Sequence, residues 1–426
     1  MKKIVLSLAS VLAATAFAPE ASAIPAFARQ TGMACNACHQ QHFPVLNSFG
    51  MAFKASGYTM MGSQGKIEAE HMSIPDTLNM SMLIKARYQD TNGTDAVGTL
   101  SGQTTNGGQW QIPDEFALFA GGRVAENIGV FTEINVAGTQ TAGGAVVAGF
   151  KLPFSFDVGG AQLGVIPFTA GAGPAFGFEL SSQSLTSAIR WSEDRVIQSA
   201  NQIGLNTVNA TGLALVARND MGYINFTRWS PNFTASGASS IQLRSNWLRI
   251  AATPTVADWN MHIGLGVASG TNYTATGTVF TQVDTKATVL DFQGQTQLGG
   301  KDFSLYANYA RAPGTAAGAL VANLFNANVN AQTAWVIGAD YSVIPNTLHI
   351  GGAIKRGDNG LVTLNKDNAI MVQGIYDLAQ NVALHLVHTK HNGSSWDLGG
   401  VNRPTVSSGA LSGGDSLTTF MLEAAW

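Results

Sequence analysis

The sequence has 426 residues, of which only 12% are charged and 48 are glycine. A soluble protein usually has about 25% charged residues, whereas an outer-membrane barrel has fewer because its outer wall faces lipid. The formal net charge of -3 excludes a strongly basic surface and argues against nucleic acid as a partner.

Residues 1–23 have the features of a secretory signal peptide. Lys2 and Lys3 form the positive start, residues 4–17 form the apolar stretch, and residues 21–23 form a small-residue cleavage pattern. The alternative is an uncleaved anchor helix, which the short apolar stretch disfavours. Removing this segment takes away two lysines and one glutamate, so the net charge becomes about -4. We therefore expect an exported mature chain that begins at Ile24.

The chain has two cysteines, and they stand in the sequence Cys35-Asn36-Ala37-Cys38-His39. This is the spacing of c-type haem attachment, in which each thiol adds to one haem vinyl group. His39 follows directly, so its imidazole can reach the iron as the proximal ligand. A disulfide, a thioredoxin-like redox pair and a zinc site are the alternatives. A redox pair would need a βαβ context, which the sequence lacks, and zinc would need more ligands nearby. We predict one covalent haem c.

From Asp76 onward, apolar and polar residues alternate, which is typical of strands with one apolar face and one polar face. In residues 79–88 the alternation has one exception, Leu83. The apolar face there comprises Met80, Met82, Ile84, Ala86 and Tyr88, and the polar face comprises Asn79, Ser81, Lys85 and Arg87. The same pattern recurs in residues 115–124, 130–136, 259–267, 303–309 and 348–355.

The connections between these strands alternate between short and long. Short turns are expected near residues 125–127, 158–160, 218–220, 253–258, 299–302, 344–346 and 378–380. Longer stretches rich in Gly, Ser, Thr and Asn lie between them, for example at residues 90–108, 171–210, 270–284, 313–331 and 390–414. Short periplasmic turns and long external loops are the pattern of outer-membrane barrels. Together they predict a β-barrel of about 16 antiparallel strands, with both of its ends at the periplasmic side.

Two further segments bear on this fold. In the last strand Phe420, Leu422 and Trp426 share one face, and a terminal aromatic on the lipid side resembles the assembly signal of bacterial outer-membrane proteins. A soluble β-sandwich or β-helix is the alternative, and no fixed-period repeat supports a β-helix. In the long connection at residues 171–210, we expect a short helix over residues 187–197 and a loop folded into or over the barrel mouth.

The residues around the haem motif resemble a known family. The stretches are Pro25-Ala26-Phe27-Ala28-Arg29-Gln30-Thr31-Gly32-Met33-Ala34, Gln41-His42-Phe43-Pro44-Val45-Leu46-Asn47-Ser48-Phe49-Gly50 and Phe53-Lys54-Ala55-Ser56-Gly57-Tyr58. They closely resemble the fused monohaem cytochrome–porin family of iron-oxidising bacteria. Met51 stands where that pattern leads us to expect a basic residue. The resemblance implies a cytochrome segment before an outer-membrane porin that oxidises ferrous iron at the cell surface.

The distal haem ligand is the open question of the site. Met60 is our leading prediction because it lies 21 residues after His39, beyond Gly57, where the chain can turn back. His71 is the second candidate, and His42 is too close to His39 in sequence to reach the other haem face. Met33, Met51, Met61 and Met72, a five-coordinate haem and a ligand from the barrel wall also remain open.

The polar strand faces place a set of titratable side chains toward the lumen. They are Lys85, Arg87, Glu115, Arg123, Glu133, His262, Asp291, His349, Lys355 and His385. A solvated pore lining accounts for them, and guidance of Fe²⁺ by carboxylates or imidazoles is the alternative. His385, His388 and His391 alternate between faces or enter a loop, so we do not interpret them as a metal site.

These inferences define three parts: a signal peptide at 1–23, a mainly helical cytochrome segment at 24–75, and a barrel at 76–426 whose lumen this segment plugs. The chain has no second haem motif, so one haem must be reached from both sides of the outer membrane. The resemblance implies that extracellular Fe²⁺ is the electron donor and that a periplasmic cytochrome c or a similar carrier is the acceptor. A diffusion porin with a structural or gating plug, or a cytochrome that oxidises another small reductant, is the alternative.

We predict that the purified mature protein keeps its haem after denaturation and shows c-type absorption on reduction. Replacing both Cys35 and Cys38 with Ala should abolish both properties, because the two thioether bonds are then missing. Haem that survives denaturation in the double variant would contradict covalent attachment.

Overall fold

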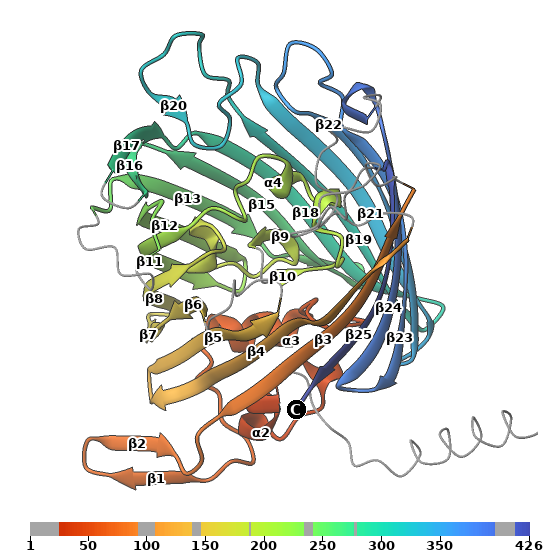
Figure 1. Ribbon diagram of the computed structural model, residues 1–426. Helices are drawn as coiled ribbons and strands as arrows, with labels where there is room; N and C mark the ends of the chain where they lie inside the picture. Colours follow the sequence, from red (N-terminus) through yellow and green to blue (C-terminus); the bar gives the residue numbers. More distant parts are fainter. Residues whose placement is uncertain are drawn as a thin grey trace, which may run out of the picture.

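A computed structural model describes residues 25–92, 107–138, 146–186, 189–233, 242–276, 279–396 and 414–426. The predicted signal peptide lies outside these residues. The chain forms a closed barrel (Figure 1). In chain order its strands are β3 (Met80–Thr91), β4 (Gln109–Ala125), β5 (Ile128–Gly138), β6 (Val146–Lys151), β7 (Phe154–Val158), β8 (Ala161–Ala170), β11 (Ala210–Asn219), β12 (Gly222–Ser230), β13 (Ser245–Ala252), β14 (Thr255–Val256), β15 (Trp259–Ser269), β18 (Ala287–Leu298), β19 (Lys301–Ala312), β21 (Gln332–Ile344), β22 (Leu348–Asp358), β23 (Asn368–Ala379), β24 (Val382–Asn392) and β25 (Ser416–Ala425).

The barrel has 16 antiparallel strands within the described ranges, as the sequence predicts. β6 and β7 are two pieces of one strand, since both pair with β5 and β8. β13 and β14 likewise share their partner β15. The last strand, β25, pairs with the first, β3, from Leu417↔Thr91 to Ala425↔Leu83, and this pairing removes the open sheet edges.

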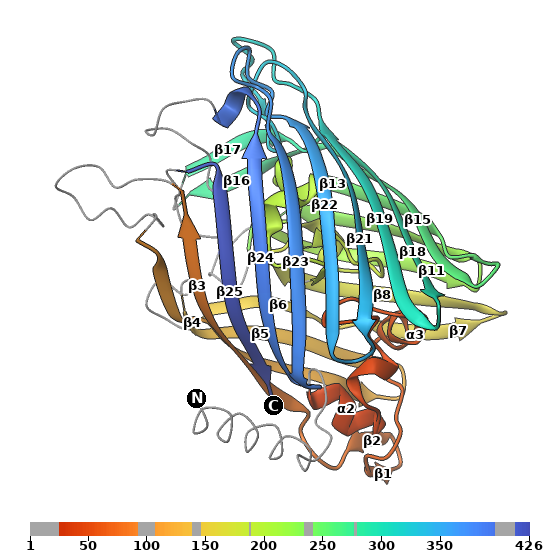
Figure 2. The ribbon, with the colours of Figure 1, turned by 90° about the vertical axis from the view of Figure 1, so that its right-hand side faces the viewer.

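Short and long connections lie at opposite ends of the barrel (Figure 2). The short turns follow β4, β7, β11, β14, β18, β21 and β23, at the positions that the sequence predicts. At the long-loop end, β16 (Thr271–Thr276), β17 (Val279–Asp284) and β20 (Ala322–Asn323) form a small separate sheet. The 3-10 helix η5 (Ser394–Trp396) follows β24 at the same end.

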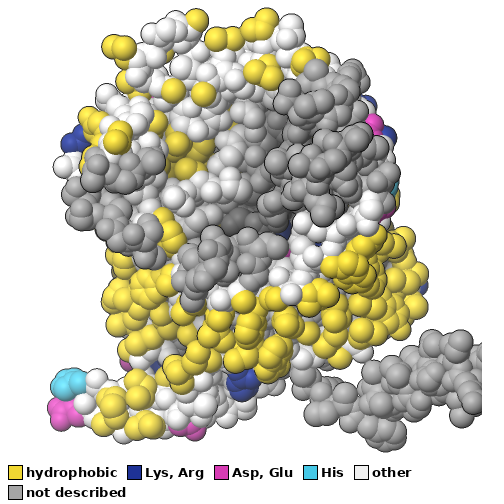
Figure 3. Space-filling model, viewed as in Figure 1, with side chains coloured by type: hydrophobic (Ala, Val, Ile, Leu, Met, Phe, Trp, Pro, Cys, Tyr) yellow, Lys and Arg dark blue, Asp and Glu magenta, His cyan; other side chains and the backbone are white. Residues whose placement is uncertain are grey.

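The outer surface of the barrel carries an apolar belt (Figure 3). In β3 the burial alternates along the strand, so Ser81, Lys85 and Arg87 point inward as predicted. Outward-facing members of the belt include Ile224, Phe226, Leu248, Ile250, Leu265, Leu290, Ile337, Ile350, Ile370, Val372, Leu386, Phe420 and Leu422. A closed barrel with such a belt satisfies its backbone internally and presents apolar side chains to lipid. The protein is therefore a bacterial outer-membrane protein.

The N-terminal segment closes the short-turn mouth of this barrel (Figures 1 and 2). It contains α2 (Pro25–Thr31), the 3-10 helix η1 (Cys35–Ala37) and α3 (Ser48–Ala55). The hairpin of β1 (Lys66–Ala69) and β2 (Met72–Pro75) follows, and it projects outside the barrel instead of plugging it. Most of its side chains are exposed, including the apolar Ile67, Met72 and Ile74. None of the helices in the described part of the chain is long and apolar enough to cross a bilayer.

Gln30 joins this segment to the barrel. Its side chain is fully buried, and its Nε2 donates hydrogen bonds to the carbonyl oxygens of Tyr58 (2.6 Å) and Met60 (2.8 Å). Its Oε1 accepts from Asn79 Nδ2 (3.0 Å) and from the backbone N–H of Arg123 (3.1 Å). One buried amide thus ties α2 to the chain after α3 and to the rim of β3 and β4.

The connection between β8 and β11 folds into the lumen, as the sequence suggests for residues 171–210. It contains η2 (Pro174–Phe176), β9 (Gln183–Thr186), β10 (Ile189–Arg190), η3 (Arg195–Ile197) and α4 (Ser199–Gln202). The helix predicted over residues 187–197 is wrong for the described part, where only η3 is helical. Trp191 is fully buried and stacks on Tyr306 at 4.9 Å, so contacts with the barrel wall override the local helical preference.

Buried ion pairs hold this loop in place. Glu179 accepts from Arg249 Nε at 3.0 Å and from Tyr223 Oη at 2.9 Å. Arg249 also contacts Asp291 at 2.5 Å, and its side chain is fully buried. A buried charge is tolerated only when it is paired, so the loop and the wall stabilise each other here.

We predict that Arg249→Met releases the loop from the wall. The substitution leaves Glu179 and Asp291 buried without their guanidinium partner, which costs about 3–5 kcal/mol. Heat-modifiable gel migration should show unfolding at a lower temperature, and single-channel conductance should rise. Arg228→Met is the matched control on neighbouring β12, because Arg228 is exposed and donates to Asn246. Equal unfolding temperatures and equal conductances in the two variants would show that the Arg249 ion pairs do not hold the loop in the lumen.

Candidate haem-attachment site and the cavities around it

The Cys-x-x-Cys-His residues form a tight turn inside the short-turn mouth. The backbone N–H groups of Cys38 and His39 both donate to the carbonyl of Cys35, at 3.1 Å and 2.9 Å. Cys35 and Cys38 are not joined by a disulfide. The Cys35 thiol contacts the carbonyl of Gln380 at 3.1 Å, in the short turn between β23 and β24. The barrel therefore holds the turn directly.

His39 is held in an orientation that suits a metal ligand. Its Nδ1 lies 3.2 Å from the carbonyl oxygen of Val45, and its ring packs edge-on against Phe43 at 5.3 Å. A hydrogen bond from Nδ1–H to that carbonyl leaves Nε2 free to bind iron. Burial lowers the pKa of His39 to about 4, so the imidazole is neutral at physiological pH. Neutral imidazole is the form that binds metal.

Helix α3 packs against the Cys-x-x-Cys-His turn, and two residues at the start of the helix explain why. Asn47 caps α3 by accepting from the backbone N–H of Gly50 at 2.9 Å, and its Nδ2 donates to the carbonyl of Ala37 at 3.0 Å. A Cβ atom at Gly50 would lie only 2.1 Å from the carbonyl oxygen of Cys38. The glycine therefore permits a backbone contact that any other residue would block.

A cavity of about 490 Å³ opens beside the turn. Cys35, Cys38 and His39 form one end of its wall. Aromatic and aliphatic residues line much of the rest: Phe27, Phe43, Leu46, Phe53, Tyr58, Leu83, Phe119, Phe131 and Phe176. Charged residues on the same wall are Lys54, Lys85, Glu115, Glu133, Lys151, Arg190 and Glu193.

The barrel wall contributes an apolar patch to this cavity. Leu83, the exception in the alternation of β3, faces the lumen with Phe119 of β4 and Phe131 of β5. The rings of Phe119 and Phe131 are 6.0 Å apart. Lumen-facing positions of a water-filled barrel are usually polar, so this patch marks a wall that contacts an apolar group. The broken alternation was the sequence signal for it.

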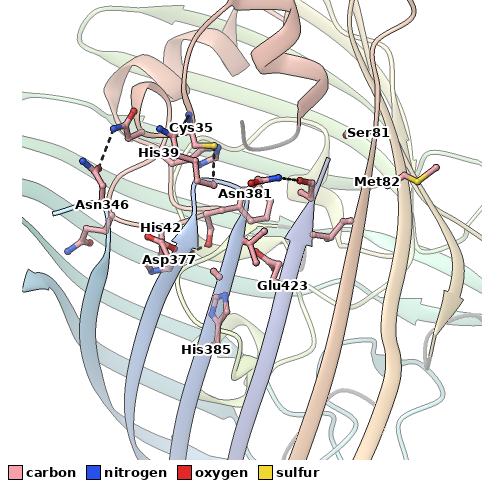
Figure 4. A pocket seen from close by; sticks show the side chains of 18 of the residues that line it. Cys35, His39, His42, Ser81, Met82, Asn346, Asp377, Asn381, His385 and Glu423 are labelled. Carbon is pink, nitrogen blue, oxygen red and sulfur yellow. Dashed lines mark hydrogen bonds between the residues drawn. The ribbon is translucent and has the colours of Figure 1, made fainter. Parts of the chain in front are cut away.

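A second cavity, of about 70 Å³, lies on the other side of the turn (Figure 4). Cys35 and His39 line it together with His42, His385 and Glu423. His42 is buried, and its Nε2 lies 4.0 Å from Asp340 Oδ2. Burial lowers the pKa of His42, but the negative charges of nearby Asp340 and Asp377 outweigh this effect, so the pKa is raised overall. The walls of both cavities are mainly apolar, and the smaller cavity adds two imidazoles and a carboxylate close to the turn.

The structure separates the candidates for the distal ligand. Met33 lines the larger cavity with Cys35 and His39, whereas Met60 is absent from the walls of both cavities. His71 lies at the exposed tip of the β1–β2 hairpin, and Met72 lies on the same hairpin. Met51 belongs to α3 and packs against the hydrophobic core. The assignment of Met60 stays a prediction, and among these candidates Met33 shares a cavity wall with Cys35, Cys38 and His39.

The titratable residues predicted to face the lumen do so. Buried inside the barrel are Lys85, Arg87, Glu115, His262, Asp291, His349, Lys355 and His385. Glu133 lines the larger cavity, and Arg123 reaches Ser73 at 2.7 Å near the mouth. Most of these charges pair with one another or with the inserted loop, so they do not form a simple solvated lining.

Together these residues fit a haem. The two thiols and the oriented imidazole share a wall with an apolar cavity, and lysines line the same space. In a loaded protein Cys35 and Cys38 would carry the thioether bonds and His39 would bind the iron. Lys54 and Lys151 were not singled out as site residues from the sequence, because only the folded barrel brings them to this cavity.

No family model matches the chain, and no curated protein matches it. Among solved structures, OprB of Pseudomonas putida matches with a TM-score of 0.53 and 10% identity, over 91% of this chain and 99% of that chain. OmpF of Salmonella typhi in complex with daunomycin matches at 0.48 and 11%, over 85% and 100%. DcaP, an outer-membrane channel of Acinetobacter baumannii, matches at 0.47 and 12%, over 82% and 97%. At this identity, the similarity to OprB shows the barrel fold.

We predict that Gly50→Ala reduces the yield of haem-loaded protein several-fold. The added methyl group collides with the Cys38 carbonyl and displaces α3, at a cost of about 1–3 kcal/mol. Gly374→Ala is the matched control, since a Cβ atom there meets nothing within 4 Å. The ratio of haem absorbance to protein, with limited proteolysis of the N-terminal segment, measures the effect. Equal haem loading in the two variants would show that the contact is unimportant.

Proposed function

We propose that this outer-membrane protein passes electrons from extracellular Fe²⁺ to a periplasmic carrier through one haem c held by Cys35, Cys38 and His39. The course of the larger cavity is the observation that carries the proposal. It begins at the haem-binding turn and also reaches Gly171, Asn209 and Phe233, which lie at the long-loop ends of β8, β11 and β12. A small donor can therefore approach the turn from the external side.

The haem, when bound, supplies reversible one-electron chemistry. Each Fe²⁺ gives up one electron and leaves as Fe³⁺, and the carrier accepts that electron. His39, with its Nδ1 held by the Val45 carbonyl, would offer its Nε2 to the iron, and Leu83, Phe119 and Phe131 would give the haem an apolar wall.

The periplasmic side of the turn is the exit for the electron. Cys35 contacts Gln380, and exposed Asn36 donates to Asn346 Oδ1 at 3.3 Å (Figure 4). Gln380 and Asn346 each lie in a short turn of the barrel. A soluble cytochrome c that docks on these turns comes close to the haem-bearing residues. One haem thus serves both sides, which matters because the apolar band of an outer membrane is roughly 25 Å tall.

Fe²⁺ acts as a passing donor in this proposal. Within the described ranges, no three His, Cys, Asp or Glu side chains gather as a metal site. Electron transfer does not require a ligated donor, since the ion needs only to approach the haem. Another small soluble reductant that enters the same cavity is the close variant of this proposal.

A diffusion channel is the second candidate function. The 16-strand barrel fold, which OprB shares, favours it. In that case the N-terminal segment and the inserted loop would restrict the lumen and set its selectivity. The two candidates differ in whether electrons or solutes pass.

Intact cells can decide between them. The protein is expressed in a host that does not oxidise iron, Fe²⁺ is added outside, and haem reduction is followed optically. We expect the haem bands to become reduced, and then reoxidised when a soluble cytochrome c is supplied to the periplasmic side. Haem that stays oxidised with Fe²⁺ but is reduced by dithionite would overturn the iron proposal. The Cys35→Ala/Cys38→Ala variant is the control for electron transfer, and solute uptake into proteoliposomes tests the channel.

A further inference from the structure

Nearly every cation buried in this lumen has a carboxylate partner. Lys85 lies 3.2 Å from Glu115, 3.3 Å from Glu193 and 3.3 Å from Glu423. The other pairs are Arg87 with Asp114 (2.8 Å), Arg190 with Glu193 (2.8 Å), Arg249 with Glu179 (3.0 Å) and Lys355 with Asp367 (3.1 Å). This pattern follows from the high cost of leaving a buried charge unpaired.

Lys54 and Lys151 depart from this pattern. Among the described residues, neither amine has a carboxylate within 4.0 Å, and both line the larger cavity. Lys151 is only 5% exposed, and its Nζ donates to the carbonyl of Phe176 at 3.2 Å. That Nζ also lies over the rings of Tyr58 and Phe176, at 5.5 Å and 5.0 Å from their centroids.

The charges on Lys54 and Lys151 are not neutralised by the loop. Glu179 is the carboxylate that acts on Lys54 through space, but Arg249 and Tyr223 already occupy its oxygens. Burial lowers the pKa of Lys54 to about 8, so this amine is still mostly protonated at neutral pH. Two amines without carboxylate partners on one mainly apolar cavity wall favour an anionic occupant, because its negative charge would stabilise the protonated form of both amines.

We propose that Lys54 and Lys151 hold the two propionate carboxylates of the haem. The inference rests on the proposed function, because it needs a haem attached at Cys35 and Cys38. The wall of this cavity includes the two thiols, His39, several aromatic rings and the two amines. Two cations match two carboxylates, and they make the lysines positioning residues for the ring.

The same two amines would also suit a free dianion such as inorganic phosphate. The haem propionates are the better match, because the cavity is continuous with the residues that anchor the haem. A free anion would not need the rings of Phe27, Phe53 and Tyr58 beside it. Experiments can distinguish the haem propionates from free inorganic phosphate.

The test measures the midpoint potential of the purified full-length haem protein. A nearby cation favours the reduced haem, so Lys54→Gln and Lys151→Gln should each shift the balance toward the oxidised form by about tenfold. For a one-electron couple, that is about 59 mV. Lys54→Arg and Lys151→Arg should keep the original potential. Lys366→Gln, at an exposed lysine paired with Asp358, is the single-charge control.

Correct assembly is scored first by heat-modifiable migration, and the Soret circular dichroism reports how firmly the ring is held. If Lys151→Gln does not assemble, Lys54→Gln carries the test, because α3 is not part of the barrel wall. An unchanged potential and Soret dichroism in assembled, haem-loaded Gln variants would overturn this inference alone. The absence of covalent haem from the unsubstituted protein would overturn the proposed function as well.

Inorganic phosphate is the probe for the free anion. Added to the unsubstituted haem protein, it should leave the potential unchanged, since the propionates already occupy the amines. A saturable shift with phosphate that disappears in Lys54→Gln and Lys151→Gln would show that the lysines hold a free anion, and it would overturn the assignment to propionates.

Discussion

The pairing of charges inside the barrel is the constraint on which the rest of this structure depends. Closing the sheet puts one face of every strand into a confined lumen, where an isolated ion is costly. Arg249 therefore binds Glu179, and Lys85, Arg87 and Arg190 converge on Glu193. Both carboxylates belong to the loop between β8 and β11, so the same pairs that neutralise the wall also hold that loop in the lumen.

With the loop held there, the space that remains lies beside β3, β4 and β5, where the N-terminal segment enters. Gln30 and the α3 cap place the haem-binding turn at one end of this space. Leu83, Phe119 and Phe131 make its wall apolar, which is unusual for the inside of a porin-like barrel. Lys54 and Lys151, which lack carboxylate partners, line this same cavity. The charges and the shape of the cavity therefore both support the proposed haem.

This arrangement differs from a chain of haems across a membrane. A single redox centre inside a barrel can be approached by a small ion from one side and by a protein from the other. The inserted loop and the N-terminal segment narrow the lumen, and they leave a passage whose walls include Glu133 and Asn209. Under the proposed function, the barrel houses the electron-transfer site as well as forming a pore.

The sequence by itself determined the features that depend on local pattern. Period-two alternation and alternating turn lengths predicted the 16-strand barrel and the seven short turns, and the spacing of Cys35, Cys38 and His39 pointed to the haem-binding turn. Only the tertiary structure decided the path of residues 171–210, where Trp191 and Glu193 find partners on distant strands, and the outward position of the hairpin that carries His71. It also separated Met33 from Met60 and brought Lys54 to Lys151 across 97 positions of sequence. Contacts between distant strands depend on how the barrel closes, and no local pattern of residues records that closure.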